Sequence, residues 1–137
     1  MDREAPYMLT LKMLEGTREG LKDPHSILLS RSTARAIYGD GNPLNKMIRI
    51  DNKQDVKVTG VYEDFPLNSQ FNDLDFIAPW NLYVSSEKWV QWDADHWDNS
   101  SFQVFAQIAD NTNFKTVNKR ARTIMVPPIV GVPAFFR

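Results

Sequence analysis

The densest set of groups that could hold a metal ion lies at residues 93–98, with the sequence Asp-Ala-Asp-His-Trp-Asp. Alternating carboxylates open the calcium loop of an EF-hand, which also needs a glycine at its sixth position and a bidentate glutamate at its twelfth. Asp98 and Val104 stand at those two positions, so the ligand set is incomplete. We therefore predict a solvated acidic loop here, and no metal site in the chain.

Nucleophilic catalysis needs a base beside the nucleophile, and His25 and His96 are the two histidines of the chain. Neither lies near a Gly-x-Ser-x-Gly elbow, and nothing marks out two of the carboxylates as a glycosidase pair. The chain also lacks cysteine and a Gly-x-x-x-x-Gly-Lys-Ser/Thr phosphate loop. We predict that it is not an enzyme and binds no nucleotide or other cofactor. A pocket joining either histidine to a serine and a carboxylate would instead favour a hydrolase.

Three tryptophans, Trp89, Trp92 and Trp97, are the remaining candidates for a binding surface. Trp89 and Trp92 are three residues apart and would share one face of a helix, whereas Trp97 would follow on a loop. Flat aromatic faces stack on sugars and anchor protein interfaces, but they also fill the cores of small domains. Both interpretations stay open, and the exposure of these side chains decides between them.

Length and charge bound the remaining possibilities. A chain of 137 residues is one ordinary domain, long enough to bury a core without metal or disulfide support. Its formal net charge of -1 gives no excess of cations for a phosphate backbone, so we exclude nucleic acid as a partner. No stretch approaches the roughly 20 apolar residues that a membrane-spanning helix requires.

The pattern of apolar residues and turn signals predicts strands interspersed with short helices. The expected strands are residues 7–14, 27–29, 47–50, 56–61, 71–77 and 101–108. We expect one helix over residues 33–38, capped by Ser30 or Ser32 and ended by Gly39. A second helix starts near residues 85–87, and Asn113 caps a third. This mixture favours an α+β domain with a mixed, largely antiparallel sheet.

Several turn and loop residues are expected to set the geometry of the chain. Pro43 lies in a dense turn signal, and residues 51–53 join two strands as a hairpin. Gly60 interrupts the alternation, because Val61 falls out of phase with the valines before it, and a bulge would restore the phase. Residues 64–69 read as a loop in which Pro66 removes a donor and Asn68 favours a local turn.

The order of these motifs resembles that of the MacB-like periplasmic core domain of ABC-transporter permeases, in the FtsX-like permease superfamily. The matching motifs are Tyr-Gly-Asp at 38–40, Pro-Leu-Asn-Lys at 43–46 and Val-x-Gly-Val-x-x-Asp-x-Pro-x-Asn-Ser-x-Phe at 58–71. Asn45 replaces a glycine of the family pattern, and Gln70 replaces a histidine. Asparagine tolerates left-handed backbone, so the turn survives the first change.

The resemblance implies a non-catalytic domain on the periplasmic face of the inner membrane, with residues 1–137 a fragment of that domain. It implies that the domain couples cytoplasmic ATP hydrolysis to periplasmic movement and to partner or cargo contact in export. Its implied partners are an ABC ATPase subunit or domain, a second permease copy, a periplasmic adaptor protein, and the membrane through other parts of the parent. An extracytoplasmic ligand-binding module with an aromatic surface is the alternative.

Overall fold

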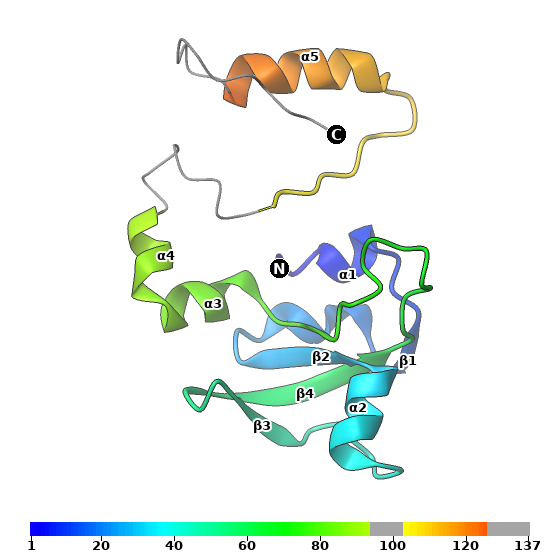
Figure 1. Cartoon of the computed structure of the whole chain (residues 1–137), viewed down its shortest axis with the longest axis vertical. Coiled ribbons are helices and arrows are strands. Elements are labelled where there is room, and N and C mark those ends of the chain that lie inside the picture. The colour runs from blue at the N-terminus through cyan, green and yellow to red at the C-terminus, as the bar shows by residue number, and fades with distance from the viewer. Residues whose placement is uncertain (94–102, 126–137) are drawn as a thin grey trace. The chain divides into compact units, whose positions relative to one another are not determined.

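The computed structural model describes residues 1–93 and 103–125 (Figure 1). The chain divides into two compact units, Met1–Ser101 and Phe102–Arg137. The first contains a five-stranded sheet with short helices, and the second contains helix α5 (Phe114–Met125). The predicted α+β class with a mixed, largely antiparallel sheet is therefore confirmed.

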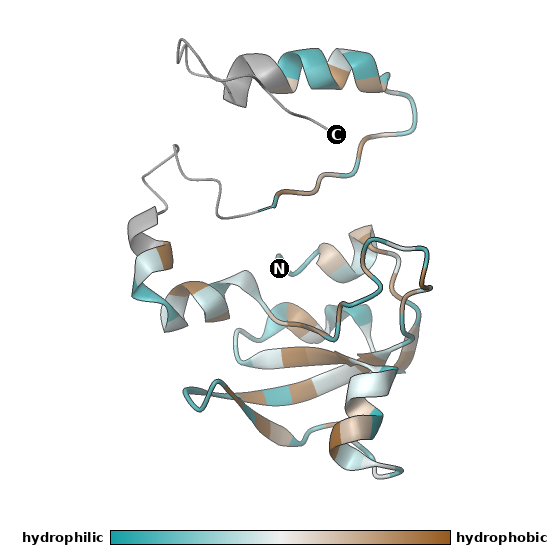
Figure 2. Cartoon of the chain, in the orientation of Figure 1, coloured by the Kyte–Doolittle hydropathy of each residue, from teal (hydrophilic) through white to brown (hydrophobic). Residues whose placement is uncertain are grey.

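Strand β4 (Gln54–Tyr62) is the centre of the sheet. It pairs in parallel with β2 (Ser26–Ser30) and antiparallel with both β3 (Met47–Ile50) and β1 (Met13–Gly16). The two-residue strand β5 (Phe76–Ile77) pairs antiparallel with β2. β2 is buried along its whole length, as expected for a strand covered on both faces. In β4, apolar residues alternate with polar ones, as the colouring in Figure 2 shows.

Helix α2 (Arg31–Tyr38) follows β2 directly, as the sequence predicts. Ser30 is its N-cap, and the Ser30 hydroxyl accepts a hydrogen bond from the backbone N–H of Thr33. Gly39 ends the helix with a φ of 61°, where glycine has no steric penalty. Its ψ of -126° lies outside the left-handed helical region, so the cap differs from the expected geometry although the same residue forms it.

The predicted hairpin is present between β3 and β4. Asp51 and Asn52 form its turn with φ values of 49° and 55°, in the left-handed region that tight hairpins require. Before β3, the backbone N–H of Lys46 donates a hydrogen bond to the carbonyl of the buried Pro43. Asn45 has a φ of 62°, which explains why asparagine serves where the family pattern has glycine.

Gly60 lies where the pairing of β2 with β4 changes register, because Ile27 pairs with Val58 and Leu28 with Gly60. The extra residue returns Val61 to the face that carries Val56 and Val58, and all three valines pack in one cluster. A side chain at Gly60 would meet the Leu28 Cδ2 at 2.9 Å and the Glu15 carbonyl oxygen at 3.0 Å. The position therefore combines a change of register with a close approach of neighbours, at a φ outside the left-handed region.

Two apolar clusters form the core. One joins Ile27 and Leu29 of β2 to the β4 valines, Ala34 of α2 and Leu82 of α3 (Trp80–Ser86). The other joins Leu28 and Tyr62 to Leu11, to Leu21 of the 3-10 helix η1 (Arg18–Lys22), and to Ile77. Since successive residues of a strand point to opposite faces, β2 contributes to both clusters.

The strand expected at residues 7–14 is wrong for most of its length. Residues Ala5–Met8 form helix α1, with Pro6 in its first turn, where a missing N–H costs no hydrogen bond. Thr10 then has a φ of 52°, which breaks the extended backbone, and β1 begins only at Met13. Leu11 is nevertheless buried, so its apolar character reflects core packing rather than a strand.

Three other expectations also fail in part. Only residues Phe76–Ile77 of the strand expected at 71–77 pair, because turns occupy residues 69–74. Residues 103–108 form no strand, and residues 101 and 102 lie outside the described part. The helix expected to start near residues 85–87 begins at Lys88, as α4 (Lys88–Asp93). Ser85 and Ser86 are instead the last two residues of α3. The hydroxyls of Ser85 and Ser86 bind carbonyls of α3 behind them instead of capping α4.

Helix α5 begins as predicted after Asn113. The Asn113 side-chain oxygen accepts a hydrogen bond from the backbone N–H of Lys115 at 2.9 Å, which satisfies one donor of the first turn. Within residues 1–93 and 103–125, no helix is long and apolar enough to cross a bilayer.

Candidate interaction site

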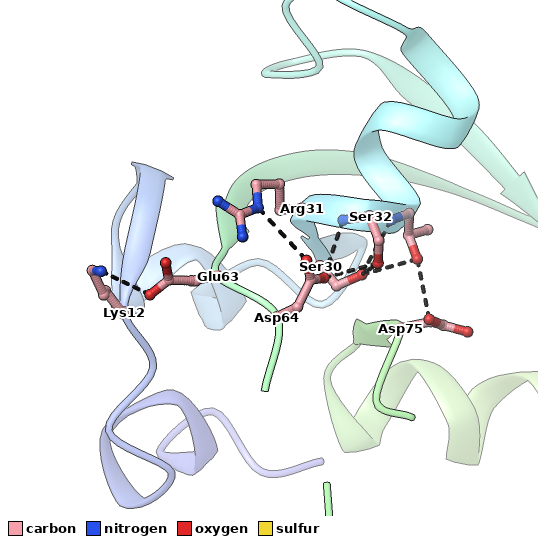
Figure 3. Close-up of polar contacts among 8 residues, drawn as sticks. Lys12, Ser30, Arg31, Ser32, Glu63, Asp64 and Asp75 are labelled. Carbon is pink, nitrogen blue, oxygen red and sulfur yellow. Dashed lines mark hydrogen bonds and ion pairs between the residues drawn. The ribbon is translucent and has the colours of Figure 1, made fainter. Parts of the chain in front are cut away.

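Asp64 binds the first turn of α2, and it lies at the start of the loop that follows β4. Its Oδ1 accepts hydrogen bonds from the backbone N–H of Ser32 at 3.1 Å and from the Ser32 hydroxyl at 2.8 Å (Figure 3). Its Oδ2 lies 3.6 Å from the Arg31 Nε. Partial burial acts to raise the pKa of Asp64, but the hydrogen bonds from Ser32 and the Arg31 charge outweigh it and lower that pKa.

Asp75 binds the same helix start from the other end of the loop. The Asp75 carbonyl accepts the backbone N–H of Ser30 at 2.8 Å, and the Thr33 hydroxyl donates to the Asp75 Oδ1 at 3.3 Å (Figure 3). Residues 64–75, named here the 64–75 loop, are therefore held at both ends by residues 30–33. Because the N-terminus of a helix carries partial positive charge, two carboxylates are suited to this place.

A neighbouring ion pair fixes the strand that enters the 64–75 loop. The Lys12 Nζ lies 2.8 Å from the Glu63 Oε2 (Figure 3). The backbone N–H of Glu63 also donates to the Lys12 carbonyl at 2.8 Å. The hydrogen bond from Lys12 lowers the pKa of Glu63. The pair is solvent-exposed, so it sets geometry more than it adds stability.

Tyr62 and two phenylalanines support the loop from inside. The Tyr62 hydroxyl donates to the Leu74 carbonyl at 2.6 Å, and burial raises the pKa of this phenol. The Phe65 ring centroid lies 6.1 Å from that of Tyr62 and 5.8 Å from that of Phe71. Such tilted contacts are favourable for aromatic rings. The loop therefore has a small packed base of its own.

The tip of the loop presents an apolar side chain to solvent. Ser69 donates its backbone N–H to the Pro66 carbonyl at 2.8 Å, which closes a turn over Leu67 and Asn68. The Ser69 hydroxyl accepts the N–H of Phe71, so the turn satisfies its donors locally. Leu67 is 91% exposed. Pro66 and Asn68 are also exposed, in the loop position that the sequence predicts.

Of the three tryptophans predicted as a contact surface, the structure describes the side chain of Trp89 alone. Trp89 on α4 is 44% exposed, whereas the Trp92 side chain and all of Trp97 lie outside the described part. Trp89 instead meets Tyr83 at a ring-centroid distance of 6.2 Å, and Tyr83 meets Trp80 at 5.7 Å. Sequence reasoning missed Trp80 and Tyr83. Their spacing of three residues directly after Pro79 was the available signal for a shared helical face.

A pocket of about 290 Å³ lies beside these aromatic residues. Phe76, Trp80 and Tyr83 line it, and the ion pair between Lys53 and Glu87, at 3.0 Å, lies at its wall. We call this pocket with Trp80, Tyr83 and Trp89 the aromatic surface. Exposed aromatic rings beside a pocket suit an apolar or aromatic group of a ligand or partner.

The described residues contain no group of three potential metal ligands. Asp93 ends α4, while Asp95, His96 and Asp98 lie outside the described part. His25 is exposed in the turn before β2, and its backbone N–H donates a hydrogen bond to the Asp23 carboxylate. It stands at the start of a strand, as the sequence indicates.

Comparison with known proteins identifies the family. The model of the MacB-like periplasmic core domain matches residues 1–124. The chain belongs to this family. Its members are periplasmic domains of ABC-transporter permeases and are generally non-catalytic. Among curated proteins, none matches the chain.

Two solved structures of the same fold are similar to it. The periplasmic region of MacB from Actinobacillus actinomycetemcomitans has a TM-score of 0.59 and 17% identity, over 90% of this chain and 54% of the other. A domain described as part of a permease from Porphyromonas gingivalis has a TM-score of 0.58 and 18% identity, over 90% of this chain and 55% of the other. The chain thus spans about half the length of these solved chains.

Proposed function

We propose that residues 1–137 form part of a single extracytoplasmic domain that serves an ABC-transporter permease without catalysing a reaction itself. In this role it sits on the periplasmic face of the inner membrane and converts cytoplasmic ATP hydrolysis into periplasmic movement and contact with cargo or partners in export. The family match over residues 1–124 carries this proposal.

The geometry of the 64–75 loop supports a mechanical role. Asp64 and Asp75 attach its ends to the start of α2, and Tyr62 holds its base. An element that transmits force must not deform locally, and a preorganised loop also loses little entropy on contact. The 91% exposed Leu67 at the tip then provides a contact whose position follows that of α2.

The proposed partners lie outside this chain. They are the ABC ATPase subunit or domain of the parent transporter, a second permease copy, and a periplasmic adaptor protein. The parent would reach the membrane through its other parts.

Leu67 in the parent transporter tests the proposal. Leu67→Ser should lower export while basal ATP hydrolysis persists. In this proposal ATP is hydrolysed on the cytoplasmic side of the membrane, whereas Leu67 lies on the periplasmic side. Met47→Ser is the matched control, since Met47 is an exposed apolar residue of β3 outside the loop. Both variants should unfold like the parent chain in urea, because neither side chain belongs to the core.

Two results would contradict the proposal. One is equal export from the parent and the Leu67→Ser transporter. The other is catalytic turnover by the isolated chain on an ester, glycoside or peptide substrate.

The aromatic surface favours a second function, an extracytoplasmic ligand-binding module. Its support is the pocket of about 290 Å³ next to the tilted, contacting rings of Trp80 and Tyr83. Titrating the chain with a set of short apolar and aromatic peptides, followed by tryptophan fluorescence, tests this function. Saturable binding that Phe76→Ala abolishes would support it, and no binding by any peptide would reject it.

A further inference from the structure

Charge is strongly segregated along this chain. All 17 acidic residues lie at or before Asp110, whereas residues 111–137 carry Lys115, Lys119, Arg120, Arg122 and Arg137. Residues 111–137 therefore have a net charge of +5, and residues 1–110 have a net charge of -6. The overall charge of -1 conceals this asymmetry. Asymmetry of this kind suggests that one end of a protein meets an anionic partner.

Most of these positive charges belong to one helix. Four of the five lie within α5 (Phe114–Met125). Helical spacing puts Phe114, Val117 and Ala121 on one side. Lys115, Lys119 and Arg120 fall on the remaining surface, and all three are exposed. The helix is thus amphipathic, with its apolar strip bordered by cations.

Part of this apolar strip faces solvent. Phe114 is 67% exposed, and in the same compact unit Val104 is 81% and Phe105 is 44% exposed. A basic amphipathic helix with an exposed phenylalanine is the type that lies flat in the interface of a bilayer, with the ring among acyl chains and the cations among phosphates.

We propose that α5 binds the surface of an anionic lipid bilayer through Phe114 and its flanking lysine and arginine side chains. Charge complementarity favours this partner, because anionic headgroups attract residues 111–137 and repel residues 1–110. This surface is independent of the proposed role in export.

The inference is tested with the full chain and extruded vesicles, by flotation on a density gradient. The chain should float with vesicles of phosphatidylcholine and phosphatidylglycerol, and should stay behind with phosphatidylcholine alone. High salt should release it, since the Debye length falls to about 3 Å at 1 M. Lys115→Gln/Arg120→Gln should weaken partitioning about 30-fold, from about 5-fold for each lost cation near the surface. Phe114→Ser should also weaken it.

Arg35→Gln/Lys46→Gln is the matched control, because it removes two exposed cations from the acidic part of the chain. It changes the net charge by the same amount and should leave partitioning unchanged. Circular dichroism of each variant checks that α5 still forms, and glutamine is itself a good helix former.

Three results would overturn the inference. The first is equal flotation with neutral and anionic vesicles, and the second is an equal loss for the α5 and control variants. The third is no flotation by the parent chain together with salt-sensitive self-association that Lys115→Gln/Arg120→Gln abolishes. That third result would identify the acidic part of a second copy as the partner of α5.

Discussion

Replacing Asp64 with alanine should detach the first end of the 64–75 loop from the start of α2, while the contacts of Asp75 with Ser30 and Thr33 remain. The substitution removes the acceptor of two hydrogen bonds from Ser32, at 3.1 and 2.8 Å, and leaves a backbone N–H of the first helical turn without its partner. A hydrogen bond to a charged group contributes about 1.5–3 kcal/mol, and loss of a helix cap costs about 0.5–2 kcal/mol. The Asp64 side chain is 35% exposed, so water replaces part of what is lost.

We therefore expect Asp64→Ala to lower the free energy of unfolding by about 1.5–2 kcal/mol, the interval that the two ranges share. Asp64→Asn should cost less, about 0.5–1 kcal/mol, because the amide oxygen still accepts from Ser32 but the charge is gone. Asp73→Ala is the control, since Asp73 is an exposed carboxylate of the same loop. Urea unfolding followed by tryptophan fluorescence measures all three.

The pH dependence gives a second, independent readout. The folded-state pKa of Asp64 lies below its ordinary value of 3.8. Its contribution is therefore complete above 3.8 and is lost as the pH falls through the lower, folded-state value. The difference in stability between the parent chain and Asp64→Asn should be constant near neutral pH and shrink in acid.

A double-mutant cycle with Ser32→Ala isolates the contact itself. Because both substitutions remove the hydrogen bond from the Ser32 hydroxyl to Asp64, while Ser32→Ala keeps the bond from the backbone N–H, the two costs should add only in part. The reasoning is refuted if Asp64→Ala costs no more than Asp73→Ala, or if the costs at Asp64 and Ser32 are additive.

Three further substitutions probe backbone geometry and buried contacts by urea unfolding. Gly60→Ala should cost about 1–3 kcal/mol, because the added Cβ would lie 2.9 Å from the Leu28 Cδ2; an unchanged stability would show that the neighbours move aside freely. Asn45→Ala should cost about 1 kcal/mol at a φ of 62° while Asn45→Gly should not, and equal costs would contradict the backbone argument. Tyr62→Phe should cost about 1–3 kcal/mol, since the Leu74 carbonyl loses its donor at 2.6 Å; a neutral result would mean that water replaces the hydroxyl.

Local signals were sufficient for the β2-α2-β3-β4 part of the fold. The apolar run before Ser30 predicts a buried strand, the serine caps a helix, and Gly39 ends it, all within a few residues of one another. The phase change at Gly60 even predicts the register shift, because the side-chain period of a strand is two and one extra residue must reverse the facing.

The alternation of apolar and polar residues gave wrong strand predictions for two segments that do not pair as expected. Residues 7–11 and 103–108 alternate like strands, yet the first segment turns through α1 and Thr10, and the second pairs with no strand within residues 1–93 and 103–125. A strand needs the backbone groups of a neighbour, and a pattern of side chains does not reveal whether that neighbour exists.

The sequence therefore shows which residue types build the candidate site, but it does not predict which of these residues contact one another. The composition of residues 64–69 predicts a loop. The hydrogen bonds from Ser32 to Asp64 and from Thr33 to Asp75, by contrast, join residues that are 32 and 42 positions apart in the chain. The same holds for the wall of the pocket, where Lys53 of the hairpin turn meets Glu87 across 34 residues. The order of residues determines each local preference for turn, strand or cap. Only the packing of β2, α2 and β4 around a common core decides which distant side chains come within hydrogen-bonding reach.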